Sequence, residues 1–166
     1  MISIRKLNKS DEAQLTFLLD ETEKTLIDKH FWLPINEEAR KHFLDDEWCY
    51  FLGAFDGDKL VAASCLFLNE HEYKESQTLI NLPTNVKTAE IGRSMVLKNY
   101  RGNNLLYAIN KKLIEKAKEL SIKNIIVTIH PQNIASIKSF AKINAEFVLK
   151  TVKCEEYDRN IYLIKL

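Results

Sequence analysis

The spacing of apolar residues along the chain predicts a mixed α/β fold. Residues Ile2 to Leu7 alternate between apolar and polar positions, which is the pattern of a half-buried strand. Ser10-Asp11 then supplies an expected N-cap, with Glu12 in the first turn of a helix that continues through Leu19. A second helix is expected from Asn36 through Leu44, because Pro34 interrupts the chain just before it.

A hairpin is the expected structure of the next segment. Two apolar runs, residues 50–55 and 60–68, flank Asp56-Gly57-Asp58. Asp-Gly between two apolar runs is a strong hairpin signal, because both residues tolerate the positive φ of a tight turn. The segment from Asn69 to Lys87 is polar and contains Pro83, which indicates a variable loop with room for one short helix.

The second half of the chain alternates predicted strands and helices. A strand at 89–96 leads through a loop at 100–106 into a helix that ends near Leu120. This helix repeats apolar residues at three- and four-residue steps, namely Leu106, Ile109, Leu113, Ala117 and Leu120. Residues Asn124 to Ile129 are nearly all β-branched or aliphatic, which is typical of a strand that is buried on both faces.

The last elements are a helix and two closing strands. The helix opens on Asn133, its expected N-cap, and its apolar face would consist of Ile134, Ile137, Phe140 and Ala141. Strands are expected around 147–149 and 161–164, on either side of the turn-rich segment 155–160. The expected order of elements is therefore β-α-α-β-β-β-α-β-α-β-β.

The strand, loop and helix at 89–120 outline an anion site. A helix N-terminus that follows a strand and a loop directs free N–H groups toward an anion, and Arg101 adds a cation. The helix then returns the chain to a parallel neighbouring strand through a right-handed crossover. The alternative is an ordinary helix start with an exposed arginine.

Three motifs in this half resemble those of the GCN5-related N-acetyltransferase (GNAT) family. The segment Arg101-Gly102-Asn103-Asn104-Leu105-Leu106 is similar to the family's pyrophosphate loop, Gln/Arg-x-x-Gly-x-Gly/Ala. Met95-Val96 matches an apolar-x-Val that often precedes this loop, and Asn133 to Ser136 matches a later Asn-x-x-Ser/Ala. Asn104 and Leu106 depart from the pattern, although asparagine tolerates the left-handed region better than other non-glycine residues.

The resemblance implies a fold and a co-substrate. The fold would be a central, mostly antiparallel sheet with one parallel β-α-β crossover and flanking helices, in a single domain spanning 1–166. The co-substrate would be acetyl-coenzyme A. The residues implied in its binding are Met95, Val96, Arg101, Gly102, Asn103, Asn104, Leu105, Leu106 and Asn133.

The resemblance also implies an activity. The enzyme would move the acetyl group to a primary amine of a small molecule or peptide, by direct attack of the amine on the thioester. Glu90 is the candidate general base, because only a neutral amine attacks and alkylamines are mostly protonated near pH 7. Glu90 could instead pair with Arg93 or Lys87. Strand N–H groups near Met95-Val96 would stabilise the developing oxyanion.

Phe140 stands where many family members place a tyrosine that protonates the departing thiolate. Phenylalanine cannot donate a proton, so the expected role is that of a core aromatic residue. Tyr107 and Tyr157 are alternative donors, and coenzyme A could also leave as a thiolate.

Two alternatives belong to other functional classes. The first is a non-catalytic acyl-coenzyme A-binding or regulatory domain of the same fold, suggested by Asn104, Leu106 and Phe140. The second is an unrelated α/β nucleotide-binding protein. The sequence lacks Gly-x-x-x-x-Gly-Lys-Ser/Thr and Gly-x-Gly-x-x-Gly, the two motifs that would favour it.

Composition narrows the classes of partner that the chain is expected to bind. At 166 residues the chain is expected to form one domain, and its formal net charge of +1 argues against nucleic acid and anionic membrane surfaces. No apolar run is long enough to span a bilayer, and residues 1–6 do not form a secretion signal, so a cytoplasmic monomer or homodimer is expected.

The cysteines and histidines do not indicate a metal site. Cys49, Cys65 and Cys154 lack paired spacing and are expected to be reduced, small core residues. The four histidines show no metal-ligand spacing, so no metal is expected.

Overall fold

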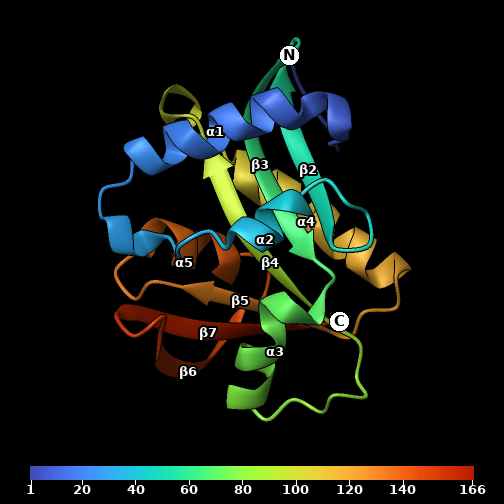
Figure 1. Ribbon diagram of the computed structural model, residues 1–166, viewed down its shortest axis with the longest axis vertical. Coiled ribbons are helices and arrows are strands. Elements are labelled where there is room, and N and C mark those ends of the chain that lie inside the picture. Colours follow the sequence, from blue (N-terminus) through green and yellow to red (C-terminus); the bar gives the residue numbers. More distant parts are fainter.

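A single seven-stranded mixed sheet organises the molecule (Figure 1). The computed structural model describes all residues from 1 to 166. The strand order is β1-β2-β3-β4-β5-β7-β6, and every neighbouring pair is antiparallel except β4 and β5. The strands are β1 (Ile2–Lys6), β2 (Cys49–Asp56), β3 (Lys59–Phe67), β4 (Thr88–Val96), β5 (Asn124–Ile129), β6 (Glu146–Lys153) and β7 (Tyr157–Lys165). The predicted fold class, with its single parallel crossover, is therefore confirmed.

Helices cover both faces of the sheet. They are α1 (Glu12–Lys24), α2 (Glu37–Lys41), α3 (Glu70–Leu79), α4 (Leu105–Glu119) and α5 (Ile134–Ala141), with short 3-10 turns at Lys9–Asp11, Lys29–Phe31 and Lys98–Tyr100. In Figure 1, α1, α2 and α3 lie in front of the sheet and the crossover helix α4 lies behind it. Alternating strand residues contribute to two large cores, one beneath α1 and α2 and one beneath α4 and α5, and a small third cluster of Ile126, Ile161 and Leu163 packs against Tyr73 of α3. None of the helices is long and apolar enough to cross a membrane.

Strands β4 and β5 separate soon after they meet. Their parallel ladder contains three residue pairs, Thr88↔Asn124, Ala89↔Ile125 and Glu90↔Ile126. Beyond Glu90 the two strands diverge, and Figure 1 shows β4 and β5 pointing in different directions. This divergence opens a seam in the middle of the sheet, and the candidate site lies in it.

A β-bulge shapes the open part of β4. Gly92 pairs with Cys65 and Met95 pairs with Ala63, so Arg93 and Ser94 together oppose one β3 residue, Ser64. Arg93 has a φ of 49°, a left-handed conformation that is uncommon for arginine. Bulges redirect side chains, and this one turns Arg93 and Ser94 toward the seam.

The predicted start of α1 is confirmed in position, because the helix begins at Glu12 with Asp11 as its N-cap residue, although the Asp11 side chain forms no capping hydrogen bond to the helix. A 3-10 turn at Lys9–Asp11 that was not predicted precedes the helix, and the Asn8 side chain caps this turn by accepting from the Ser10 N–H at 2.9 Å. Asp11 completes a capping box by accepting from the Asn8 N–H at 2.9 Å. It also forms two hydrogen bonds with Arg5, at 2.7 and 2.8 Å, which hold the pKa of Asp11 below its ordinary value.

Several other boundaries differ from the prediction. The polar segment 69–87 contains a ten-residue helix, α3, capped by Asn69, whose side chain accepts from the His71 N–H at 3.0 Å. Helix α2 ends at Lys41 rather than Leu44. Strands β6 and β7 are longer than expected, so most of the predicted turn-rich segment 155–160 is strand. Order and type of the remaining elements agree.

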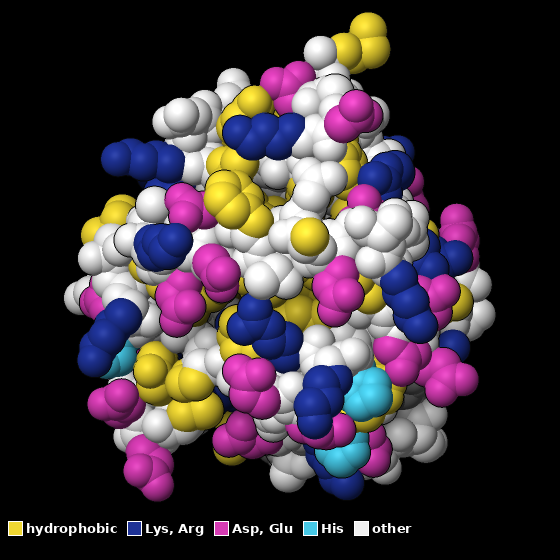
Figure 2. Space-filling model, turned by 45° about the horizontal axis from the view of Figure 1, so that its top comes forward, with side chains coloured by type: hydrophobic (Ala, Val, Ile, Leu, Met, Phe, Trp, Pro, Cys, Tyr) yellow, Lys and Arg dark blue, Asp and Glu magenta, His cyan; other side chains and the backbone are white.

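Three side chains that were predicted to be buried are exposed in the structure. Ile134 is 52% exposed and Ala141 is also exposed, so the apolar face of α5 is narrower than predicted. Cys154 is exposed in the β6–β7 turn, whereas Cys49 and Cys65 are buried as expected. On the face shown in Figure 2, acidic and basic side chains are interspersed, in keeping with the net charge of +1.

Candidate functional site

Two adjoining cavities occupy the seam. The larger, which we call the groove, has a volume of about 360 Å³ and runs past the loop at 100–107, the end of α1 and one side of α5. The smaller, which we call the inner cavity, has a volume of about 140 Å³ and lies between β4, β5 and residues 31–33. The two share six lining residues at their junction: Phe31, Trp32, Ser94, Asn133, Ser136 and Phe140.

The loop before α4 has the backbone shape of an anion-binding turn. Gly102 has a φ of +82°, which glycine adopts at no steric cost. Asn104 has φ 55° and ψ 21°, the left-handed conformation that asparagine tolerates best among non-glycine residues. This geometry explains how asparagine can stand where the family pattern has glycine.

Six consecutive N–H groups, in this loop and the first turn of α4, have no acceptor within the chain. The N–H groups of residues 102–107 form no hydrogen bond with backbone or side-chain atoms, and the Asn104 side chain does not cap the helix. The first turn of an α-helix always leaves such donors free. Together with the helix dipole they make this end of the groove suitable for a phosphate group.

Arg101 lies beside these donors. Its Nη2 donates to Thr25 Oγ1 at 2.8 Å, and its Nε donates to the Val96 carbonyl oxygen at 3.3 Å. No carboxylate lies within 4.0 Å of its guanidinium, and the residue lines the groove. Its positive charge is therefore available to an anion.

The other residues predicted for cofactor binding divide into two groups. Val96, Asn103, Leu105 and Leu106 line the groove. Met95 does not, because its side chain is 1% exposed and packs in the core beneath α1, so only its backbone can face the seam. Asn133 caps α5 by accepting from the Ser136 N–H at 3.3 Å, and it also lines both cavities.

Glu90 lies in the inner cavity without a partner. Its Oε2 atom is buried and forms no hydrogen bond. Desolvation, partly offset by Lys153, raises the pKa of Glu90 to about 7. The alternative pairing with Lys87 or Arg93 is not found, because Lys87 donates to the Leu120 carbonyl oxygen at 2.6 Å and Arg93 donates to two other carbonyl groups. A carboxyl group with these properties can accept a proton near neutral pH.

Phe140 lies at the junction of the cavities. It is 3% exposed and belongs to the core beneath α4, as predicted, yet its ring also lines both cavities. The hydroxyl groups at this junction belong to Ser94 and Ser136, and Ser94 Oγ lies 2.8 Å from Ser64 Oγ. Tyr107 lines the groove but not the junction, and Tyr157 lines neither cavity.

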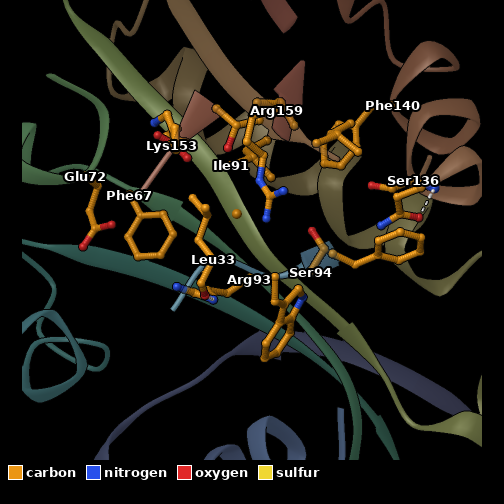
Figure 3. A pocket seen from close by; sticks show the side chains of 18 residues that line it. Leu33, Phe67, Glu72, Ile91, Arg93, Ser94, Ser136, Phe140, Lys153 and Arg159 are labelled. Atoms are coloured by element: carbon orange, nitrogen blue, oxygen red, sulfur yellow. Dashed lines mark hydrogen bonds between the residues drawn. The ribbon is translucent and has the colours of Figure 1, made fainter. Parts of the chain in front are cut away.

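The sequence did not reveal most of the charged side chains of the inner cavity. Glu72 comes from α3, Lys153 from β6 and Arg159 from β7, and Figure 3 shows them around the cavity together with Arg93 and Ser94 of the bulge. Their positions are far apart in the chain, and none belongs to a motif. The longer β6–β7 hairpin and α3, a ten-residue helix where the sequence indicated a loop with room for one short helix, bring them together.

Comparison with known proteins agrees with this geometry. The family model described as the acetyltransferase (GNAT) family matches residues 12–144. A search of curated proteins gave no match.

Solved structures of acetyltransferases share the fold. A probable acetyltransferase from Staphylococcus epidermidis is 21% identical, with a TM-score of 0.75 and 99% of each chain covered. Arabidopsis thaliana NAA60 in complex with acetyl-CoA is 13% identical, with a TM-score of 0.77, covering 100% of this chain and 99% of that one. An acetyltransferase of the GNAT family from Streptococcus pneumoniae is 17% identical, with a TM-score of 0.73 and coverage of 100% and 99%. Fold, loop geometry and family match agree, and the chain belongs to the GNAT acetyltransferase family.

Proposed function

We propose that this protein transfers an acetyl group from acetyl-coenzyme A to a primary amine by direct attack of the amine on the thioester. The observation that supports this most strongly is Glu90, a half-buried residue whose Oε2 atom is buried without a hydrogen-bond partner, in a cavity that adjoins the groove. We also propose that residues 1–166 act as a single domain in the cytoplasm.

The groove is suited to the coenzyme from one end to the other. The free N–H groups of 102–107 would hold the diphosphate, with Arg101 as the accompanying cation. Val96, Leu105 and Leu106 would contact the remainder of the coenzyme along the groove, and Asn133 would face its thioester end at the junction. NAA60 is itself known with acetyl-CoA bound, on the same fold.

Glu90 would act first in the reaction. It would take a proton from the acceptor's ammonium group, and the neutral nitrogen would then form a C–N bond with the acetyl carbonyl carbon. Backbone N–H groups of β4 near Met95-Val96 would stabilise the oxyanion as it develops. The C–S bond would then break with departure of a thiolate, whose conjugate thiol has a pKa near 8.5, and the second proton on the nitrogen would pass to that thiolate or to water, so no protein acid is needed.

Phe140 supports a second candidate function. A ring that lacks a hydroxyl at the junction is also compatible with a domain that binds acyl-coenzyme A without catalysis. Stoichiometric binding of acetyl-coenzyme A without turnover of a broad panel of amines would favour this alternative.

Binding of acetyl-coenzyme A should stabilise the fold, because the groove exists only in the folded state. At a concentration a hundredfold above its Kd the gain should be about 2.7 kcal/mol, which raises the unfolding midpoint of a domain of this size by about 5–10 °C. Differential scanning fluorimetry with and without the coenzyme measures this. No shift at any soluble concentration would contradict both candidate functions.

Phe140→Tyr should leave turnover within a few-fold of the wild-type value. If the thiolate departs unaided, an added hydroxyl group offers nothing to the rate-limiting step, because a general acid accelerates only where proton transfer is limiting. Steady-state rates with one responsive amine test this. A gain of about a hundredfold would instead mean that the native protein lacks a required acid.

A further inference from the structure

The inner cavity holds more charge than acetyl transfer to a plain amine requires. Five charged side chains line it, the acidic Glu72 and Glu90 and the basic Arg93, Lys153 and Arg159. With all of them ionised the three positive and two negative charges leave an excess of +1. A simple alkylammonium ion would be attracted by the acidic pair but repelled by the basic three.

Arg159 is an enclosed cation that lacks an anionic partner within the chain. Its residue is 1% exposed, and its Nη1 donates to the carbonyl oxygens of His30 at 2.8 Å and Asp158 at 2.7 Å. Its Nε and Nη2 form no hydrogen bond within the chain, and no carboxylate lies within 4.0 Å. Figure 3 shows the side chain extending into the cavity. An enclosed guanidinium without an anionic partner is costly, which indicates that a ligand supplies the anion.

Arg93 is similarly placed on the opposite wall. Its Nη1 and Nη2 donate to the carbonyl oxygens of Leu33 at 2.9 Å and Pro34 at 3.2 Å, and its guanidinium lies 5.4 Å from the Trp32 ring. It forms no ion pair either. Burial lowers the pKa of Arg159, and the charge of Arg93 lowers it further, so the two guanidinium groups act on one another. An anion between them would relieve this repulsion.

Lys153 adds a third positive charge to the lining of the inner cavity. The residue is 5% exposed, and its Nζ lies 3.6 Å from Glu75 Oε2, a loose pair with a largely exposed carboxylate. Glu75 does not line the cavity, so it does not fill the space that Arg93, Lys153 and Arg159 surround.

We infer that the acceptor is a small amine that also bears a carboxylate, an amino-acid-like molecule whose carboxylate binds Arg159 while its amine faces Glu90. This inference rests on the proposed function and specifies its substrate class. The guanidinium fork of Arg159 matches a carboxylate with two parallel hydrogen bonds. The amine would occupy the part of the cavity nearest the junction with the groove, where the thioester is expected.

The experiment compares each acceptor with an analogue that lacks the carboxylate charge. Amino acids with the amine at different distances from the carboxylate are assayed beside their primary amides, which keep the carbon skeleton and lose the charge. A charged hydrogen bond contributes roughly 1.5–3 kcal/mol, so kcat/KM should be about 10–150-fold higher for the acid of the best pair. In Arg159→Gln this ratio should fall to nearly 1, with the amide rate changed less than about threefold.

Two further variants show whether a lost preference for the acid comes from the lost positive charge or from a disturbed fold. Arg159→Lys should keep part of the preference, and Lys150→Gln, an exposed change on the same hairpin, should keep all of it. If Arg159→Gln does not fold, the wild-type ratio and the lysine variant decide the question. Equal rates for acids and amides in the wild type, or a preference for peptides, would overturn the inference while leaving the proposed function intact.

If no amine is acetylated, a binding measurement can still test the carboxylate subsite separately from the proposed acetyl transfer. That outcome would overturn the proposed function, and calorimetry of the acids against the protein saturated with coenzyme A would then test the anion subsite alone. Tighter binding of the acid than of its amide, lost in Arg159→Gln, supports the subsite. Equal binding of the two refutes it.

Discussion

Glu90→Gln should lower kcat/KM for a responsive amine about 100-fold or more near pH 7. Glutamine keeps the size of the side chain and removes the group that accepts the proton. Steady-state assays of wild type and variant measure the loss, and Glu115→Gln on the exposed face of α4 serves as the matched control. Wild-type rates in the Glu90 variant would remove this residue from the mechanism.

The pH dependence of the same pair gives a sharper test. With a pKa of about 7, Glu90 should make the wild-type kcat/KM rise about tenfold per pH unit below neutrality and level off above it. The variant depends on amine that is already neutral, so its rate should keep rising toward the pKa of the amine itself. Identical profiles would contradict the assignment.

The same substitution should stabilise the fold above neutral pH. The folded protein holds the Glu90 proton more tightly than the unfolded chain, whose carboxyl titrates near 4.5. The stabilisation of the fold that comes from this tighter proton binding is fully present below about pH 4.5 and is lost as pH rises through about 7. Above pH 7 the free energy of unfolding of Glu90→Gln should therefore be higher than that of the wild type by on the order of 1–3 kcal/mol, as measured by urea denaturation. Loss of activity together with a gain in stability is not expected of a damaged fold.

Arg101→Ala should weaken acetyl-coenzyme A binding by about 1.5–3 kcal/mol, or roughly 10–150-fold in Kd. The loss follows if the guanidinium meets phosphate through a charged hydrogen bond, and it should diminish at high salt. Isothermal titration calorimetry measures it, with Lys98→Ala as the control because Lys98 is exposed, nearby and outside both cavities. Unchanged affinity at low salt would refute the assignment of the loop.

Local patterns sufficed for the elements that are decided by local chemistry. The β-branched run predicted β5 with its observed bounds, and the apolar repeat, which begins at Leu106 and ends at Leu120, predicted α4 to within a residue at each end. The loop at 101–106 was also recognisable as a candidate phosphate-binding loop, because such a loop requires a positive φ, free N–H groups and a cation, and residue types indicate all three.

Tertiary structure decided what the sequence could not show. Helix α3 is polar along most of its length and forms where it can pack on β4 and β5, so its apolar pattern was too weak to stand out. Arg159 lay in a segment predicted as a turn, and an arginine there is normally solvated. Its burial depends on β7 pairing with β5 and on residues 29–31 covering it. The isolation of Glu90 likewise depends on Arg93 donating to the carbonyl oxygens of Leu33 and Pro34 rather than to the Glu90 carboxylate.

The three-pair ladder between β4 and β5 has a mechanical consequence. It divides the sheet into two antiparallel wings, β1-β2-β3-β4 and β5-β7-β6, that share few direct backbone hydrogen bonds. The groove is lined by Ser94 and Val96 of β4 and by α5, the helix that follows β5, so a coenzyme bound there would connect the two halves of the molecule where the ladder is missing. The coenzyme would then be a structural strut as well as a reactant, and the stiffness of the protein would change with each turnover.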